Sequence, residues 1–367
     1  MTRILHRDRR DRPALTPPRG EAVELHRTIP GYRPSPLVGL PALAERIGAA
    51  RVDVKVESDR YGLPSFKIMG ASWAAVEALR PWLPPAWRPG DGLDALAGKL
   101  PSLTLVAATD GNHGRALARV GALLGLGARI LVPSALSAQR IADIEAEGAE
   151  VVVVDGTYDD AVAASAAGKD GDVLVSDTSW PGYERVPGAV IDGYATILAE
   201  TAEQLVRPPD LVIVQLGVGA FGAAVLRHFR TGGRDPAVVG VEPTTAACVM
   251  ASLAAGRLVT VPGPHDSVMA GLNCGTPSLV AWPVLQTLDA VLALDDDAAR
   301  QGVRVLGEHG IAAGECSGVA VAAAEELLTG PDRARLGLPE RPSVLLFATE
   351  GITDEAAHAA ATGQEQR

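Results

Sequence analysis

The sequence predicts an α/β fold in which parallel sheets are covered by helices on both faces. From about residue 50 onward, short apolar segments of strand type alternate with segments of helix type. Aromatic residues make up only 4% of the chain, and alanine, valine, leucine and glycine fill it instead, as expected where helices pack on sheets. The number of strand-type segments favours two sheets over one.

The expected elements follow one another in a regular order. Strands are expected at residues 50–58, 103–108, 128–133, 150–155, 172–177, 210–217, 237–243, 290–296 and 343–350, and helices at 66–79, 114–125, 135–148 and about 187–206. Ser65 is placed to cap the helix at 66–79 and Pro81 to stop it. The long helix near 187–206 is the expected crossover between the sheets. Residues 1–13 are expected to form a solvated, partly disordered tail.

Composition excludes several classes of protein. A net charge of −11 leaves no basic excess to hold nucleic acid or an anionic membrane. No apolar run reaches membrane-spanning length, and the N-terminus lacks the apolar segment of a signal peptide. Cys248, Cys274 and Cys316 show no zinc-like spacing, and this low, odd number fits a reducing cytosol. We therefore expect a cytoplasmic protein with no metal site and no nucleic-acid or membrane partner.

The ends of the strands are where a ligand site is expected, because loops and helix starts converge there in parallel sheets. The loop 109–114, TDGNHG, combines two turn-forming glycines with the carboxylate of Asp110 and the amide of Asn112. A turn with an aspartate cap explains this loop equally well. Asp177 and Thr349 also end strands, and each taken alone is more often a capping residue.

A second loop, GVGAFG at 217–222, supports two interpretations. Its glycines let a phosphate approach the backbone at the start of the next helix. The loop also matches G-x-G-x-x-G, and Glu242 follows 20 residues after Gly222, where a dinucleotide fold places its ribose-binding acid. On these residues alone a nicotinamide oxidoreductase is the leading interpretation. It leaves SFKIMGA at 65–71 and TDGNHG without a role.

Taken together, these segments match the requirements of pyridoxal phosphate better. The chain has only four lysines, and one of them, Lys67, lies at a predicted helix start. The cofactor aldehyde needs an amine, its phosphate needs N–H donors, and its 3′-oxygen and ring nitrogen each need a polar partner. One lysine, one asparagine-bearing turn, one glycine loop and one strand-end hydroxyl occur here in order.

The segments ESDRYGLPSFKIMGA, ATDGNHGRALA, SDTSWPGYERVPGAVIDGYATI, GVGAFG, VEPTTAACVMASL, SVMAGLNCGTPS and ATEGITD together resemble the fold-type II pyridoxal-phosphate enzymes, the tryptophan synthase β-subunit family. Within that family they are most similar to the 2,3-diaminopropionate ammonia-lyases. Asp110 stands before GNHG where serine and threonine dehydratases usually have serine, and Asp177 supplies a second acid.

The resemblance implies a role for each matching residue. Lys67 would bond to the cofactor aldehyde, Asn112 would contact the 3′-oxygen, and Thr349 would face the pyridine nitrogen. Asp110 and Asp177 would flank the substrate as catalytic acids or bases. The phosphate would be held by Gly217, Val218, Gly219, Ala220, Phe221 and Gly222.

The resemblance also implies an architecture. Two three-layer α/β domains with mostly parallel sheets would hold the cofactor in the cleft between them. Residues 1–75 and 205–367 would form the large cofactor-binding domain, and residues 76–204 the small substrate-side domain. A homodimer is implied, with a small amino acid as substrate. Cys248 and Cys274 resemble a cysteine pair of some relatives, but a reduced state is the default expectation.

The expected activity is elimination of ammonia from 2,3-diaminopropionate to give pyruvate and ammonia. A related serine or threonine dehydratase or a β-replacement enzyme is the nearest alternative, and a nicotinamide oxidoreductase is a remote one. A protein that binds the cofactor without catalysis is the third class.

Overall fold

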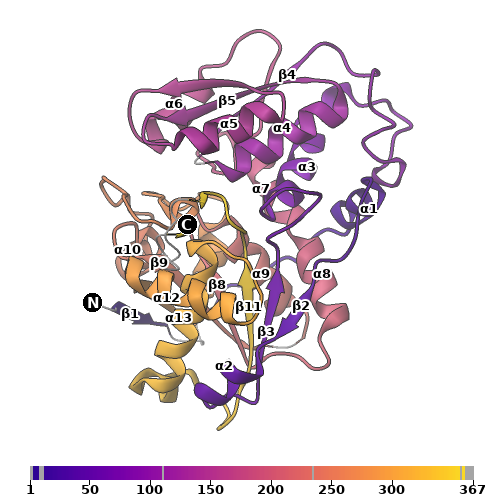
Figure 1. Ribbon diagram of the computed structural model, residues 1–367. Helices are drawn as coiled ribbons and strands as arrows, with labels where there is room; N and C mark the ends of the chain where they lie inside the picture. The colour runs from indigo at the N-terminus through magenta and orange to yellow at the C-terminus, as the bar shows by residue number, and fades with distance from the viewer. Residues whose placement is uncertain (1–2, 8–11, 110, 234, 356–357, 360–367) are drawn as a thin grey trace. The chain divides into compact units, whose positions relative to one another are not determined.

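The computed structural model describes residues 3–7, 12–109, 111–233, 235–355 and 358–359, and the chain divides into two compact units (Figure 1). Unit 1 comprises Met1–Pro17, Ser35–Ser65 and Leu198–Arg367, and unit 2 comprises Pro18–Pro34 and Phe66–Ile197. The sequence expectation assigned residues 1–75 and 205–367 to the large domain. The division into units differs from it at three segments: Pro18–Pro34 and residues 66–75 lie in unit 2, and residues 198–204 lie in unit 1. Residues 67–75 belong to a helix that packs against two other helices of unit 2.

Unit 1 is built on a seven-stranded sheet. Its strand order is β1 (Arg3–His6), β10 (Ala290–Leu294), β9 (Ala237–Pro243), β8 (Leu211–Gln215), β11 (Ser343–Ala348), β3 (Arg51–Val56) and β2 (Leu37–Gly39). The five inner strands are parallel, and the two edge strands run antiparallel to their neighbours. The helices of this unit are α2 (Pro41–Arg46), α9 (Ala220–Thr231), α10 (Cys248–Ala255), α11 (Trp282–Leu285), α12 (Asp296–Glu308) and α13 (Glu315–Thr329).

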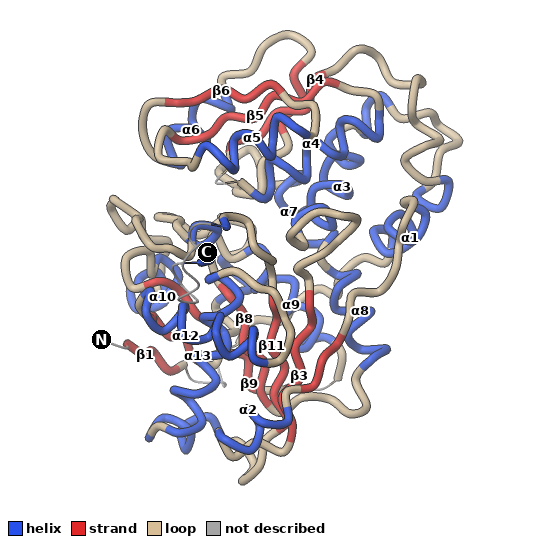
Figure 2. Tube along the Cα trace, in the orientation of Figure 1, coloured by secondary structure: helices blue, strands red, loops and turns tan. Residues whose placement is uncertain are grey.

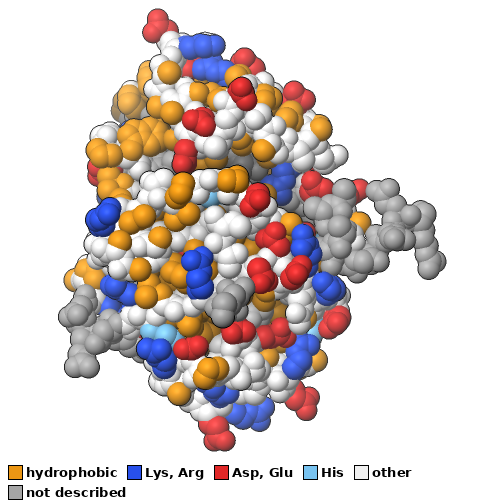
Figure 3. Space-filling model, turned by 90° about the vertical axis from the view of Figure 1, so that its left-hand side faces the viewer, with side chains coloured by type: hydrophobic (Ala, Val, Ile, Leu, Met, Phe, Trp, Pro, Cys, Tyr) orange, Lys and Arg blue, Asp and Glu red, His pale blue; other side chains and the backbone are white. Residues whose placement is uncertain are grey.

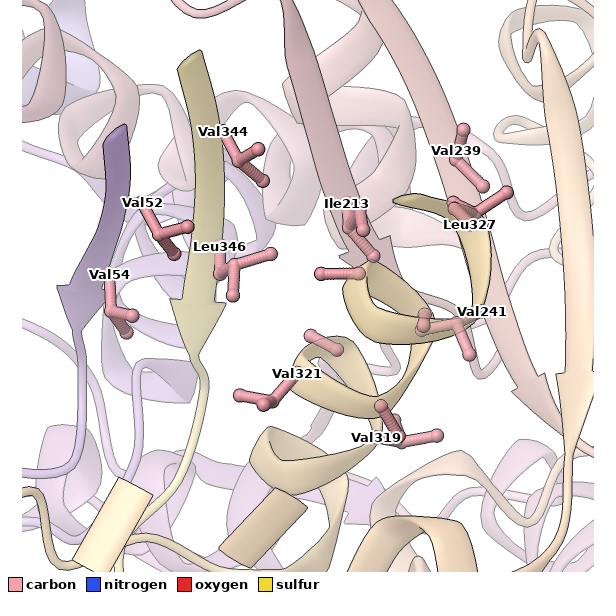
Figure 4. Packing of buried hydrophobic residues seen from close by; sticks show 14 of the residues in the cluster. Val52, Val54, Ile213, Val239, Val241, Val319, Val321, Leu327, Val344 and Leu346 are labelled. Carbon is pink, nitrogen blue, oxygen red and sulfur yellow. The ribbon is translucent and has the colours of Figure 1, made fainter. Parts of the chain in front are cut away.

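The core of unit 1 lies between this sheet and α13. Strands that are covered on both faces need apolar side chains on both faces, so their sequences are almost continuously apolar. Figure 4 shows side chains of four strands directed toward those of α13. The labelled side chains are Val52, Val54, Ile213, Val239, Val241, Val344 and Leu346 of the sheet and Val319, Val321 and Leu327 of the helix.

Unit 2 is built on a four-stranded parallel sheet. Its strand order is β6 (Glu150–Val154), β5 (Gly127–Pro133), β4 (Thr104–Ala108) and β7 (Asp172–Leu174). Its helices are α1 (Glu21–Thr28), α3 (Lys67–Ala78), α4 (Asn112–Leu124), α5 (Ala138–Ala146), α6 (Tyr158–Ala166) and α7 (Arg185–Gly193), while α8 (Ala195–Gln204) continues into unit 1. Figure 2 shows both sheets as groups of strands flanked by helices (Figure 2). The two parallel-sheet layers that the sequence predicts are confirmed.

Three local expectations are wrong. Residues 3–6 are not a disordered tail, because they form the edge strand β1, whose backbone pairs with β10. Ser65 does not cap α3; it pairs with Glu350 in an isolated bridge, and the helix begins after Phe66 without a side-chain cap. The long helix expected near 187–206 is two helices, α7 and α8. Gly193 ends α7 so close to the backbone of Met69 that a Cβ at this position would collide with it.

The surface carries charges of both signs. On the face drawn in Figure 3, acidic and basic side chains are interspersed among apolar and polar ones (Figure 3). Within the described residues, no helix combines the length and the apolar character needed to cross a membrane.

A buried cluster of charges lies where β3 ends. Lys55 donates a hydrogen bond to Glu200 at 2.9 Å, and Arg60 donates to the same carboxylate at 2.8 Å and to Glu57 at 2.6 Å. All four side chains are at most 3% exposed. Buried charges are tolerated only when they are paired, so each member depends on the others.

We expect Glu200→Gln to destabilise the protein by about 3–5 kcal/mol, because it leaves Lys55 and Arg60 with one buried anion to share. Urea unfolding followed by circular dichroism measures the change. Arg300→Gln is the control, since it removes an ion pair to Asp297, whose side chain is 93% exposed, and should cost less than about 1 kcal/mol. Equal effects of the two variants would contradict the assignment.

Candidate active site

Lys67 is the first residue of α3, and the backbone before it is fixed to the end of β11. Gly351 donates its N–H to the carbonyl of Pro64 at 2.9 Å, and Ser65 pairs with Glu350. Ser65 lies two residues before Lys67, and Glu350 lies directly after Thr349. These backbone bonds therefore tie the segment leading to the lysine to the strand end that carries the threonine.

Asp177 is the polar partner of Lys67. The Lys67 amine donates to Oδ2 of Asp177 at 2.9 Å, and the phenol of Tyr158 donates to Oδ1 at 3.2 Å. Burial by itself raises the pKa of Asp177, but the charge of Lys67, then that of His113, and the two hydrogen bonds outweigh burial and lower the pKa to about 2. The carboxylate is thus ionised at neutral pH.

The described residues of the TDGNHG loop are hydrogen-bonded to one another and to the chain that leads to Asp177. The N–H groups of Gly111 and Gly114 both donate to the Thr109 hydroxyl at 3.0 Å, which closes the turn before α4. Nε2 of His113 donates to the carbonyl of Val175 at 2.8 Å, because a carbonyl can only accept. This bond connects the start of α4 to the backbone two residues before Asp177. Asn112 is the first residue of α4 and is half-buried. Asp110 lies outside the described residues.

The GVGAFG loop forms the start of α9 in unit 1. Gly219 is the N-cap residue and has a left-handed backbone with φ of 90°, which favours glycine. A Cβ at Gly219 would collide with Leu285, and one at Gly217 would lie 3.0 Å from the carbonyl of Gly271. The loop is therefore a narrow cradle of backbone at a helix N-terminus, where N–H groups and the helix dipole favour an anion.

Glu242 does not have the role that a dinucleotide site would require. Its two oxygens accept hydrogen bonds from the N–H groups of Val249 and Met250 at 2.7 and 2.8 Å, so it caps α10. The side chain is fully buried, and burial raises its pKa to about 8. A carboxyl group that caps a helix with both oxygens is not available to bind a ribose. The nicotinamide interpretation therefore loses the acidic residue that it required after the glycine loop.

Thr349 and the three cysteines are the remaining residues that the sequence singles out. Thr349 follows β11 and is 6% exposed. The three cysteines are buried, and Cys248 and Cys274 form no disulfide in the structure. Burial raises the pKa of the Cys248 thiol well above its usual value, and that thiol faces the carbonyl of Gly217 at 3.8 Å.

Comparison with known proteins decides the family. Residues 28–347 match the model of a family described as pyridoxal-phosphate dependent enzyme. The chain belongs to this family. It is 33% identical over 358 residues to the diaminopropionate ammonia-lyase of Salmonella typhimurium, with 91% of this chain and 89% of that enzyme covered.

Solved structures of the Escherichia coli diaminopropionate ammonia-lyase are also similar to this pyridoxal-phosphate enzyme. The complex with D-serine matches with a TM-score of 0.89 and 30% identity, covering 99% of this chain and 98% of that one. The complex with an aminoacrylate-PLP azomethine reaction intermediate matches with a TM-score of 0.88 and 31% identity, at the same coverage. The fold is that of the fold-type II pyridoxal-phosphate enzymes.

The described residues fit pyridoxal phosphate on their own geometry. The amine of Lys67 suits an aldehyde, and the glycine cradle at the start of α9 suits a phosphate. Sequence reasoning found these residues but not Tyr158. Nothing in the sequence connects a tyrosine after the strand at 150–155 with an aspartate 19 positions later. The sequence also does not connect His113 with Val175, and the bond between them becomes visible only in the fold.

We expect Gly219→Ala to weaken cofactor binding at least tenfold, because a left-handed φ and the collision with Leu285 both distort the cradle. Titration of the cofactor-free protein with pyridoxal phosphate, followed by visible absorbance, measures the affinity. Gly256→Ala is the matched control, since Gly256 has φ of +66° but open space around it. A normal affinity in Gly219→Ala would show that the cradle does not hold the phosphate.

Proposed function

We propose that this enzyme is an ammonia-lyase that converts 2,3-diaminopropionate and water into pyruvate and two molecules of ammonia. Its similarity to the diaminopropionate ammonia-lyases extends over nine-tenths of the chain. The observation that carries the proposal is the partly buried hydrogen bond from the Lys67 amine to Asp177, which places a carboxylate beside the amine that would react with the cofactor aldehyde. A carboxylate also suits a substrate that carries two ammonium groups.

Each group of residues has one role toward the cofactor. Lys67 would bond to its aldehyde, Asn112 would contact its 3′-oxygen, and the backbone of Gly217–Gly222 would hold its phosphate. Thr349 would face the ring nitrogen, and a hydroxyl, unlike a carboxylate, would not force that nitrogen to stay protonated. When bound, pyridoxal phosphate supplies the electron-withdrawing ring that makes the Cα hydrogen of an amino acid acidic.

Asp177 affects Lys67 in a direction opposite to that of the helix. The N-terminus of α3 disfavours an ammonium on Lys67, whereas the carboxylate at 2.9 Å favours it. The amine must lose a proton before it can bond to an aldehyde. While the released amine of Lys67 is neutral, Asp177 would lack the positive partner whose charge does most to lower its pKa. The carboxylate would then be a stronger base at the stage where the Cα hydrogen is removed.

The proton steps follow from these positions. Asp177 removes the Cα hydrogen from one face of the substrate, and Asp110 is assigned to the opposite face, with the released amine of Lys67 as a further acceptor. The substrate's β-amine takes up a proton and leaves as ammonia. Hydrolysis of the remaining fragment consumes one water and gives pyruvate and the second ammonia. Two acids on opposite faces allow both enantiomers to react.

The proposal includes a cytoplasmic homodimer. Buried thiols that form no disulfide are typical of proteins in a reducing compartment, which supports the cytoplasmic location. The homodimer is an expectation from the family, and sedimentation or light scattering of the purified enzyme tests it.

The purified enzyme should show the visible absorbance of bound pyridoxal phosphate and release pyruvate and ammonia from diaminopropionate. Lys67→Ala should lose both the visible band and the activity, because Lys67 is the lysine that contacts Asp177 in the described part of the chain. Lys99→Ala, at an exposed lysine, is the control and should keep both.

Two results would overturn this assignment. Full pyruvate release by Lys67→Ala would remove the lysine from the reaction. A substrate screen in which serine or threonine releases its 2-oxo acid much faster than diaminopropionate releases pyruvate would make the enzyme a dehydratase. Bound cofactor without turnover of any amino acid would indicate a binding protein.

The two acids should differ in their effect on the two enantiomers. We expect Asp177→Asn and Asp110→Asn each to lower kcat for one isomer of diaminopropionate by at least about a hundredfold, the contribution typical of a general base. Stopped assays of pyruvate with separate D- and L-isomers measure this. Unchanged rates for both isomers in both variants would eliminate the two-base mechanism.

A further inference from the structure

The carboxylate of Asp177 has a hydrogen-bond donor on each oxygen. Lys67 bonds to Oδ2 at 2.9 Å, and the phenol of Tyr158 bonds to Oδ1 at 3.2 Å. The side chain of Asp177 is 8% exposed, so its orientation is set by these protein groups more than by water. The proposed reaction assigns roles to Lys67 and Asp177 but none to Tyr158.

Tyr158 is presented to Asp177 from a rigid helix start. It is the first residue of α6, directly after the N-cap Thr157. Thr157 and Asp160 form a capping box, in which the Thr157 N–H donates to the Asp160 carboxylate at 2.7 Å and the Asp160 N–H donates to the Thr157 hydroxyl at 3.3 Å. Two reciprocal bonds around one residue leave its backbone little freedom.

The two partners are also attached to one sheet. Helix α6 packs on β4 and β5, and Asp177 follows β7, which pairs with β4. The bond from His113 to Val175 holds the chain between β7 and Asp177. The distance between the Tyr158 phenol and the Asp177 carboxylate is therefore fixed by unit 2 itself.

We propose that Tyr158 is a positioning residue that holds Oδ1 of Asp177, so that Oδ2 stays aimed at the position of the Lys67 nitrogen. This rests on the proposed function, in which Asp177 is the base for one enantiomer. When the Lys67 nitrogen is engaged elsewhere in the reaction, Oδ2 would lose its donor, and the phenol on Oδ1 would keep the carboxylate from turning. Through Asp177, Tyr158 would govern the isomer that depends on this base.

The phenol also sets the basicity of the carboxylate. A donor to an ionised carboxylate stabilises the charged form, so its removal raises the pKa of Asp177. The titratable groups that face Asp177 among the described residues are Lys67 of α3, His113 of α4, Tyr158 of α6 and Tyr183 of the following turn. Of these, Tyr158 donates directly to the carboxylate and carries no charge, so its loss removes a hydrogen bond from Asp177 and changes no net charge.

The test is Tyr158→Phe in the holoenzyme, assayed on D- and L-diaminopropionate across pH. The isomer that loses its rate in Asp177→Asn should lose about tenfold in kcat/KM in Tyr158→Phe, while the other isomer stays within about twofold. The acid limb of kcat/KM for the affected isomer should move up by about half to one pH unit, because a lost hydrogen bond of ordinary strength corresponds to that shift.

Tyr183→Phe is the matched control. The Tyr183 phenol donates to the carbonyl of Leu174 at 2.8 Å and accepts from the Ser176 N–H at 3.1 Å, so it supports the turn through backbone groups. Its loss should affect both isomers alike and leave the acid limb in place. If Tyr158→Phe behaves in this same way, Tyr158 is a structural residue and the proposal is wrong.

Two further measurements keep the proposal testable. If the wild-type enzyme does not act on diaminopropionate, the proposed function fails, and the pH at which the visible spectrum of bound cofactor changes is compared instead. A shift of this pH in Tyr158→Phe supports positioning of Asp177, and an unchanged transition pH overturns it.

If Tyr158→Phe does not fold, Thr157→Ala keeps the phenol but loosens the start of α6, and it should show the same isomer-selective loss. Equal losses on both isomers would count against Tyr158.

Discussion

The buried charge cluster of Lys55, Glu57, Arg60 and Glu200 is the constraint on which the path to Lys67 depends. Its members are almost completely excluded from water, so none can leave without stranding another. The cluster fixes the chain where β3 ends and the turn toward α3 begins. Beyond the cluster, Ser65 pairs with Glu350 and the carbonyl of Pro64 accepts from the Gly351 N–H, so the backbone is held in place up to the residue before Phe66 and Lys67.

The two units contribute different chemistry. Unit 1 offers backbone: a glycine cradle at the start of α9, with a threonine at the end of a neighbouring part of the sheet. Unit 2 offers side chains: an amine, a carboxylate, a phenol and an imidazole that are bonded to one another or to adjacent backbone. Backbone donors suit a phosphate. Side chains suit groups that exchange protons, which is the role that the proposed function gives to Lys67 and Asp177.

The proposed function requires Asp177 to act in two states of the enzyme. Beside a charged Lys67 it is a strongly acidic group that balances a partly buried cation. A neutral amine on Lys67 would leave the same carboxylate buried with fewer positive partners, and burial would then favour proton uptake. The change in basicity needs no movement of the backbone. It needs a carboxylate whose orientation persists when one donor is lost, and the phenol of Tyr158 is placed to provide this.

The sequence by itself determined the fold class, the family, the cofactor and the loops that follow the strands. Apolar strands that alternate with helices predict parallel sheets. The requirements of pyridoxal phosphate are matched by four features in chain order: a lysine, an asparagine turn, a glycine loop and a threonine. Tertiary structure decided what single segments cannot express. Glu242 fits a ribose-binding acid in the sequence, but the folded chain uses both its oxygens to cap α10. Ser65 fits a cap but pairs with Glu350, and Tyr158 becomes a partner of Asp177 only because β4 brings α6 and the end of β7 together. These contacts join residues that are far apart in the chain, and local preference contains no information about them.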